Sequence, residues 1–116
     1  MIRVGVVGAC GLMGQMVCRA VAEDPELVLV AAIDRSHVGE SIGSTIGKPH
    51  LEVLVAEELH ELLTAEVEVA VDFTHPDVVS DDVEWAVAHA VDIVVGTTGL
   101  TDADLDRIRG MLESEG

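Results

Sequence analysis

A glycine-rich turn between a strand-like segment and a helix-like segment constrains this chain more than any other feature of its sequence. The segment Ile2–Val7 is β-branched and almost wholly apolar, which is typical of a strand buried on both faces. The turn that follows carries Gly8, Gly11 and Gly14, and apolar residues then recur at helical spacing. We therefore expect a buried strand that passes directly into a helix, which ends shortly before Pro25 because proline disfavours helix in the residue before it.

The rest of the chain alternates between strand-like and helix-like segments with short connections. Further strands are expected at residues 27–33, 52–55, 67–73 and 92–95, and further helices at 56–63, about 77–90 and from 101 onward. In the helix at 56–63, Leu59, Leu62 and Leu63 are expected to point inward. The stretch 36–50 has four glycines or prolines and no clean period, so it is expected to be a surface loop.

This alternation favours a parallel sheet with helices on both faces. The expected fold is α/β, a Rossmann-like doubly wound parallel sheet with strand order 3-2-1-4-5, and residues 1–116 are expected to form one dinucleotide-binding domain. The last residues close a helix, where an open α/β sheet would usually continue with another strand, so we expect the architecture to continue beyond this chain.

The charge of the chain excludes several classes of partner. Six basic residues against 22 acidic ones give a net charge of −16. Nucleic acid is not expected as a partner, because phosphate binding needs clustered Lys and Arg, and neither is an anionic membrane surface. The acidity fits either a high-salt cytoplasm, where screening relieves repulsion, or an ordinary acidic protein. With no apolar run of ~18 residues and no signal peptide, a cytoplasmic location is expected.

The glycine turn has the features of a phosphate-binding loop. Its spacing is G-x-x-G-x-x-G rather than the usual G-x-G-x-x-G. The absence of side chains lets a pyrophosphate approach the backbone, and the helix N-terminus offers free N–H groups. Asp34 lies 20 residues after Gly14, at the end of the second strand, where a carboxylate can accept hydrogen bonds from a ribose. Arg35 could pair with a 2′-phosphate. The alternatives are a purely structural turn and a solvated strand end.

Two further motifs fall at the carboxyl ends of strands, where open α/β sheets bind ligands. They are Asp72-Phe73-Thr74-His75-Pro76 and Gly96-Thr97-Thr98-Gly99. Small hydroxyl and glycine residues let the ribose and nicotinamide of a cofactor lie flat on the backbone. Each motif alone is weak, because turns after strands often have this composition.

The histidines and cysteines give no indication of a metal site or a disulfide. The histidines show no metal-ligand spacing, so no metal site is expected; they are His37, His50, His60, His75 and His89. Cys10 and Cys18 are expected to stay reduced, since the helix between them holds them apart.

Several other side chains have both a functional and an ordinary interpretation. Cys10 is either a small filler or, near a helix start, a thiol of lowered pKa. Trp85 is interpreted as packing, and the acidic pairs Glu57-Glu58 and Asp81-Asp82 are interpreted as solvated helix faces. His75 either contacts ligand or is a surface histidine.

These motifs together resemble the N-terminal domain of the dihydrodipicolinate reductase (4-hydroxy-tetrahydrodipicolinate reductase) family, which serves the diaminopimelate route to lysine. The resemblance spans nearly the whole chain, and the Asp-Phe-Thr-x-Pro and Gly-Thr-Thr-Gly motifs are its most distinctive parts. The matching segments are Val4 to Gly14, Ala32-Ile33-Asp34-Arg35, Val71 to Pro76 and Val94 to Leu100.

The resemblance implies a binding site for NADH and/or NADPH. Gly8, Ala9, Cys10, Gly11, Leu12 and Met13 would wrap the pyrophosphate. Asp34 would hold the adenosine ribose and Arg35 would meet the 2′-phosphate of NADPH. Phe73 and Thr74 would sit near the nicotinamide ribose, and Gly96, Thr97 and Thr98 would line the nicotinamide side. Some members carry a basic residue where this chain has Leu12, so phosphate binding is expected to be weaker here.

The resemblance also implies a reaction that these residues cannot complete. The family transfers a hydride from NAD(P)H to a cyclic dicarboxylate, and its substrate domain carries a His-His-x-His-Lys-x-Asp-x-Pro-Ser-Gly-Thr stretch that is absent here. We therefore expect no catalytic residue in this chain, and cofactor binding without reduction of the small dicarboxylate substrate. The full-length family member is expected to be a homotetramer.

Two alternative functions stay open at this point. One is a stand-alone dinucleotide-binding or sensor domain without catalysis. The other is a different reductase with a similar first domain, such as an aspartate or homoserine dehydrogenase, which the Asp-Phe-Thr-x-Pro motif disfavours.

Overall fold

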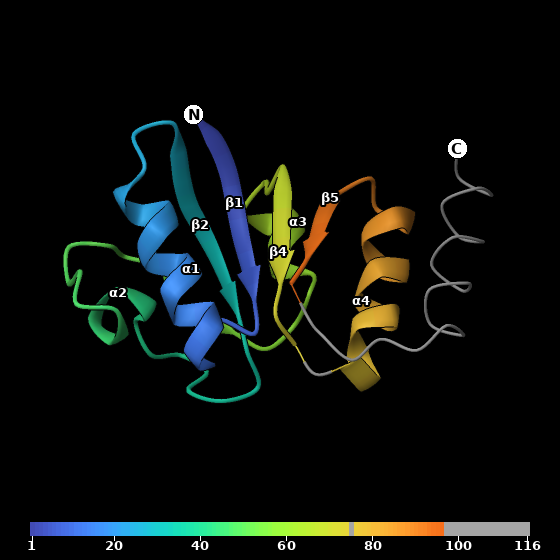
Figure 1. Ribbon diagram of the computed structural model, residues 1–116, viewed down its shortest axis with the longest axis horizontal. Helices are drawn as coiled ribbons and strands as arrows, with labels where there is room; N and C mark the ends of the chain where they lie inside the picture. The colour runs from blue at the N-terminus through green and yellow to red at the C-terminus, as the bar shows by residue number, and fades with distance from the viewer. Residues whose placement is uncertain (75, 97–116) are drawn as a thin grey trace.

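A five-stranded parallel sheet organises the residues that the structure describes, which are 1–74 and 76–96 of a computed structural model. The strand order is β3-β2-β1-β4-β5, which confirms the order expected from the sequence (Figure 1). The strands are β1 (Ile2–Val7), β2 (Leu27–Ile33), β3 (Val55–Ala56), β4 (Val69–Asp72) and β5 (Asp92–Val95), and the helices are α1 (Leu12–Glu23), α2 (Ile42–Thr45), α3 (Glu61–Thr64) and α4 (Pro76–Ala88).

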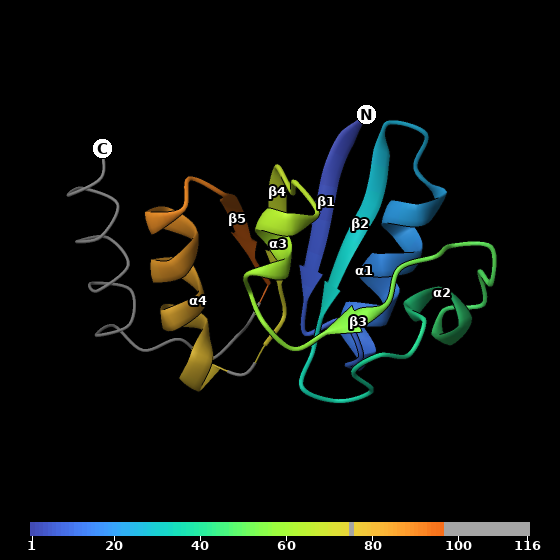
Figure 2. The same cartoon turned by 180° about the vertical axis from the view of Figure 1, so that it is seen from behind.

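Helices cover both faces of this sheet, as a doubly wound fold requires. Helices α1 and α2 lie on one face, and α3 lies on the other, as the two opposite views show (Figures 1 and 2). Val4 and Val6 of β1 pack with Cys18 of α1. Val7 of β1 and Ala86 of α4 belong to the second buried cluster, with Leu62 of α3. The alternation of β1 side chains between the two clusters is the period of two that an extended strand imposes.

The segment expected to be a surface loop contains part of the core. Ile42 and Ile46 in this stretch are 0% and 3% exposed and pack in the cluster on the α1 face. Helix α2 begins at Ile42 after Ser41, whose hydroxyl accepts the backbone N–H of Ser44. The loop prediction was wrong because two apolar residues one helical turn apart are too short a pattern to stand out in the sequence.

The region around α3 also differs from the expectation. The predicted helix at 56–63 is only the four residues of α3, and the predicted strand before it is only two residues long. Leu62 is buried as expected, whereas Leu63 is 37% exposed and does not point inward. A single helical turn buries one position, so the second of two adjacent leucines faces solvent. The helix predicted from residue 101 lies outside the described residues.

Candidate functional site

The parallel strands end at the same level of the sheet. This places the glycine turn and the two strand-end motifs that begin at Asp72 and Gly96 side by side. Val7 pairs with both Ile33 and Asp72, and Asp72 in turn pairs with Val95. The next residue after each strand end continues the hydrogen-bonded ladder. Gly8 N–H donates to Ile33 O at 2.8 Å, Phe73 N–H to Val7 O at 2.9 Å and Gly96 N–H to Asp72 O at 2.8 Å. The residues after β1, β2, β4 and β5 therefore share one edge of the sheet.

The glycine turn is shaped by close backbone contacts. Gly8 has a φ of +80°, and a Cβ there would lie 3.0 Å from the backbone carbon of Phe73. A Cβ on Gly14 would overlap the carbonyl oxygen of Gly8. A Cβ on Gly11 would meet only ordinary contact, 3.5 Å from that same oxygen. Close contacts inside the turn therefore require glycine at positions 8 and 14, whereas a side chain at position 11 would meet only ordinary van der Waals contact.

The first turn of α1 is free of groups that would compete with an anion. Its N-cap, Gly11, supplies no side-chain cap, and the first turn contains no acidic residue. The N–H groups at a helix N-terminus carry a partial positive charge that favours phosphate groups. Leu12 and Met13 at this position are 80% and 52% exposed, so they flank the turn rather than fill it.

Asp34 is held at the edge of the sheet by two backbone donors. Its Oδ2 accepts the N–H of Cys10 at 2.9 Å and its Oδ1 accepts the N–H of Ser36 at 2.9 Å. The half-buried carboxylate is therefore oriented by the glycine turn on one side and by the following loop on the other. Arg35 beside it is exposed.

The thiol of Cys10 does not have the lowered pKa that we considered. Partial burial, followed by the negative charges of Asp34 and Glu40, raises its pKa to about 11. Burial likewise raises the pKa of the Cys18 thiol to about 12. Both cysteines are free, and the half-buried Cys10 occupies the loop as a small side chain.

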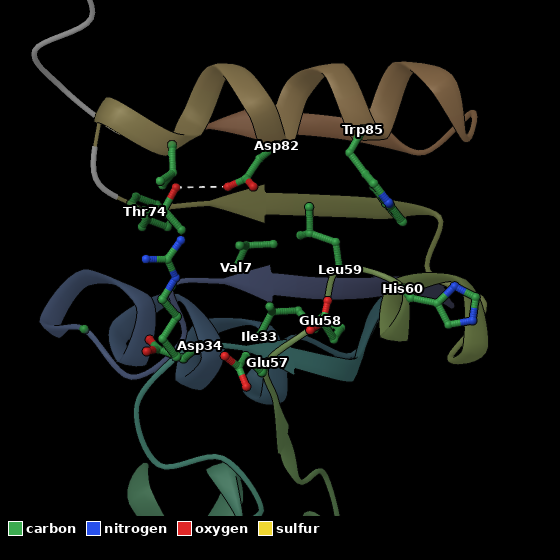
Figure 3. A pocket seen from close by; sticks show the side chains of 15 residues that line it. Val7, Ile33, Asp34, Glu57, Glu58, Leu59, His60, Thr74, Asp82 and Trp85 are labelled. Atoms are coloured by element: carbon green, nitrogen blue, oxygen red, sulfur yellow. Dashed lines mark hydrogen bonds between the residues drawn. The ribbon is translucent and has the colours of Figure 1, made fainter.

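A cavity of about 580 Å³ opens beside this edge of the sheet (Figure 3). Six of the predicted cofactor-binding residues line it, whereas the other five that the structure describes do not, namely Ala9, Cys10, Leu12, Met13 and Gly96. The six are Gly8, Gly11, Asp34, Arg35, Phe73 and Thr74. The cavity is further lined by Val7, Ile33, Glu57, Glu58, Leu59, His60, Val78, Asp82 and Trp85.

Several of these lining residues were not predicted to border a site. Trp85 was interpreted as packing, and it does pack against the second buried cluster, but it also borders the cavity. Glu57 and Glu58 are exposed, as expected of solvated residues, whereas Asp82 is half-buried, and all three also border the cavity. Asp82 and Trp85 follow Val78 by four and seven residues along α4. This spacing places all three on one face of the helix. The spacing was present in the sequence, but nothing local showed that this face would border a cavity.

Thr74 lies between two carboxyl groups in the wall of the cavity. Its backbone N–H donates to Asp72 Oδ1 at 2.8 Å, and its hydroxyl oxygen lies 2.6 Å from the same atom. The hydroxyl oxygen is also 3.1 Å from Asp82 Oδ2. Burial raises the pKa of Asp82 to about 8, aided by the neighbouring carboxyl group of Asp72 and the charge of Asp81, while the hydrogen bond from Thr74 opposes this rise.

Gly96, which follows β5, lies against the ring of Phe73, which follows β4. A Cβ on Gly96 would overlap the ring of Phe73, so only glycine fits at the end of β5 with the ring in this position. His75, Thr97, Thr98 and Gly99 lie outside the described residues. Within residues 1–74 and 76–96, no group of three or more potential ligands could hold a metal ion. No helix in the same residues is long and apolar enough to cross a membrane.

Comparison with known proteins identifies this combination of turn, carboxylate and strand-end motifs. The family model described as dihydrodipicolinate reductase, N-terminus, matches residues 2–115. The chain belongs to the dihydrodipicolinate reductase family. It corresponds to the N-terminal, NAD(P)H-binding part of that family.

Individual relatives agree with this assignment. A 4-hydroxy-tetrahydrodipicolinate reductase of Thermosynechococcus vestitus is 43% identical over 112 residues, covering 92% of this chain and 41% of the relative. That of Synechocystis sp. is 42% identical over 120 residues, covering 97% of this chain and 44% of the relative. The chain thus spans less than half the length of these members of the dihydrodipicolinate reductase family.

A solved structure of the family shows the same arrangement of strands and helices. The dipicolinate-bound dihydrodipicolinate reductase from Paenisporosarcina sp. TG-14 aligns with a TM-score of 0.78 and 32% identity. The alignment covers 99% of this chain and 44% of that structure.

Proposed function

We propose that the row of residues at the carboxyl edge of the sheet forms the cofactor site of a 4-hydroxy-tetrahydrodipicolinate reductase. The observation that carries this proposal is the shared register of the strand ends, which brings Gly8, Asp34, Phe73 and Gly96 to one edge. Open α/β sheets bind dinucleotides at this edge. In the whole protein, the bound cofactor would supply the hydride that reduces a cyclic dicarboxylate in the diaminopimelate route to lysine.

The geometry of the glycine turn fits the pyrophosphate of a dinucleotide. A Cβ on Gly11 would meet only ordinary van der Waals contact, and the first turn of α1 presents N–H groups and contains no acidic residue. Anionic groups are stabilised by such N–H groups and by the helix dipole. We assign Gly8 to Met13 to this role, with the backbone rather than the exposed Leu12 and Met13 side chains making the contacts.

The fixed carboxylate of Asp34 fits a ribose diol. Each of its oxygens accepts one backbone N–H, and a carboxylate oxygen can accept a second hydrogen bond. A hydroxyl pair could therefore bind without moving the side chain. Arg35 lines the same cavity and could meet the 2′-phosphate of NADPH. Phe73, Thr74, Gly96, Thr97 and Thr98 are assigned to the nicotinamide half of the cofactor.

The role of the described residues in the reaction is to bind and orient the cofactor and to exclude water from one side of it. The general acid and the groups that bind the dicarboxylate belong, in this proposal, to the part of the relatives that this chain does not cover. The cytoplasm is the proposed location and a homotetramer the proposed assembly of the whole enzyme. Nucleic acid and membranes have no place among the proposed partners.

Calorimetric titration of the 116-residue chain with NADH and with NADPH tests the site. We expect saturable binding that weakens at least tenfold, about 1.4 kcal/mol, in Asp34→Ala. The matched control is Asp24→Ala, which removes an exposed carboxylate at the end of α1, away from the cavity. Equal binding by the two variants, or no binding by a demonstrably folded wild-type chain, would contradict the assignment of Asp34 or of the site. In the wild-type chain, the ratio of the affinity for NADPH to that for NADH then shows whether Arg35 or Asp34 dominates the choice of cofactor.

A further inference from the structure

The hydroxyl group of Thr74 contacts two carboxyl groups, those of Asp72 and Asp82. Two hydrogen bonds need two hydrogens, and the hydroxyl group supplies one. The Thr74 hydroxyl oxygen is 2.6 Å from Asp72 Oδ1 and 3.1 Å from Asp82 Oδ2, and Figure 3 shows the second of these contacts. A hydroxyl group carries one hydrogen, and an ionised carboxylate carries none. With both aspartates ionised, one of the two contacts would therefore have no hydrogen in it.

The surroundings of the two aspartates decide which of them holds the second hydrogen. Asp72 contacts the Thr74 hydroxyl from the end of β4, and Asp82 contacts it from α4. Asp72 is fully buried, and its Oδ1 already serves as acceptor for the N–H and the hydroxyl of Thr74. The second hydrogen is therefore assigned to Asp82, which is half-buried on α4 and would donate it to the Thr74 hydroxyl oxygen.

The surroundings of Asp82 favour this protonated form. Burial is the main cause that raises its pKa to about 8, and Asp72 and Asp81 add negative charge. The other ionisable groups that face the same cavity come from the segments after β2 and β3. They are Asp34, Arg35, Glu57, Glu58 and His60. Three of these five are carboxylates, which disfavour a further negative charge.

The cluster of Asp72, Thr74 and Asp82 also connects two walls of the cavity. Asp82 belongs to α4, whereas Asp72 and Thr74 belong to the end of β4. The backbone of Phe73, between those two residues, lies against Gly8 of the glycine turn, since a Cβ on Gly8 would be 3.0 Å from it. A change in the distance between Asp82 and Asp72 would therefore shift Thr74 and Phe73, which both line the cavity.

We propose that Asp82 is a positioning residue of the cofactor site, which holds Thr74 and α4 in place through a protonated carboxyl group that donates a hydrogen bond to the Thr74 hydroxyl. The proposal rests on the proposed function. Loss of this proton in alkaline solution places two negative charges around one hydroxyl group, and the repulsion moves α4 away from the end of β4. Binding of the dinucleotide then weakens because only the protonated cluster presents Thr74 and Phe73 correctly.

The pH dependence of NADH binding tests this role. With the full chain, we expect the Kd for NADH to rise about tenfold per pH unit above pH 8, because the competent fraction falls by that factor. In Asp82→Asn the amide donates a hydrogen bond without titrating, so the Kd should stay constant between pH 7 and 9.5. Asp81→Asn is the matched control, since it removes the neighbouring exposed charge and should retain the steep rise. A rise in Asp82→Asn as steep as in the wild type would overturn the proposal.

A measurement without cofactor separates this proposal from the proposed function. Carboxyl carbon signals in an NMR titration should include one group that titrates near pH 8 in the wild type and is missing in Asp82→Asn. Absence of any carboxyl that titrates above pH 6 would overturn the assignment of a proton to Asp82. If the folded wild-type chain does not bind NADH at any pH tested, the positioning role fails together with the proposed function. The carboxyl signal still decides whether Asp82 holds a proton in this cluster.

Discussion

The carboxylate of Asp34 accepts a hydrogen bond of 2.9 Å from the backbone N–H of Cys10, which lies 24 residues earlier in the chain. The same carboxylate accepts the N–H of Ser36 through its other oxygen. One side chain thereby joins the glycine turn after β1 to the loop after β2. Asp34 is therefore a structural link at the edge of the sheet, rather than the solvated strand end that was its alternative interpretation.

Removal of this link should destabilise the fold. Asp34→Ala leaves two backbone N–H groups without their side-chain acceptor, so we expect the free energy of unfolding to fall by about 1–3 kcal/mol. Asp24→Ala is the control, because Asp24 accepts one N–H, that of Glu26, at an exposed position. In Asp24→Ala the free energy of unfolding should fall by less than about 1 kcal/mol. Urea denaturation measures both values, and equal losses in the two variants would contradict the prediction.

The close contact between Gly14 and Gly8 predicts a difference between two glycines of the same motif. Gly14→Ala would place a methyl group on the carbonyl oxygen of Gly8, so the backbone must shift, at a cost of about 1–3 kcal/mol or more. Gly11→Ala meets only ordinary contact and should change stability by less than about 1 kcal/mol. Thermal and urea unfolding provide the comparison. A Gly14→Ala chain as stable as Gly11→Ala would show that the turn adapts.

The burial of Ile42 predicts that the segment between β2 and β3 contributes to the core. Ile42→Ala should lower the free energy of unfolding by about 2–5 kcal/mol, because a fully buried side chain leaves a cavity. Val38→Ala is the matched control in the same segment, since Val38 is 48% exposed and its loss should cost about 0.5 kcal/mol or less. Similar, small effects of both substitutions would restore the interpretation of this segment as a surface loop.

The raised pKa of Cys10 predicts that its thiol reacts slowly and at a rate that depends on pH. Because its pKa is raised from 9.0 to about 11, the thiolate fraction at pH 8 is roughly a hundredfold below that of an ordinary cysteine. Alkylation by iodoacetamide, followed in a Cys18→Ser chain, should be slower by about this factor than in the urea-unfolded chain. The rate should rise about tenfold per pH unit up to about pH 11. Glu40→Gln should raise the rate, since it removes one of the charges that disfavour the thiolate.

The net charge of −16 predicts that salt stabilises the chain at neutral pH. Screening shortens the range of repulsion from ~10 Å at 0.1 M to ~3 Å at 1 M salt, so the melting temperature should rise by several degrees in molar KCl. The same experiment near pH 4.3, the isoelectric point of the sequence, is the control, because the net repulsion vanishes there. A melting temperature that does not change with KCl at pH 7 would favour the ordinary acidic protein over the high-salt interpretation.

Local patterns in the sequence predicted most of the sheet. The bounds of β1, β2 and β5 and the strand order agree with the expectation, because apolar β-branched runs and proline or glycine boundaries act on neighbouring residues. The glycine turn could be placed for the same reason. The single-turn helix α2 was missed and the bounds of α3 were wrong, since one turn holds too few apolar positions to show a period.

What the sequence by itself determined is the series of strands and turns, and hence which residues can reach the carboxyl edge of the sheet. Only the tertiary structure decided that Glu57, Glu58, Asp82 and Trp85 border the same cavity as the glycine turn. It also decided that Asp82 faces Asp72 across Thr74 rather than solvent. The physical reason is that burial and the charge state of a carboxyl group depend on what packs against it from other elements, and no local pattern encodes those partners.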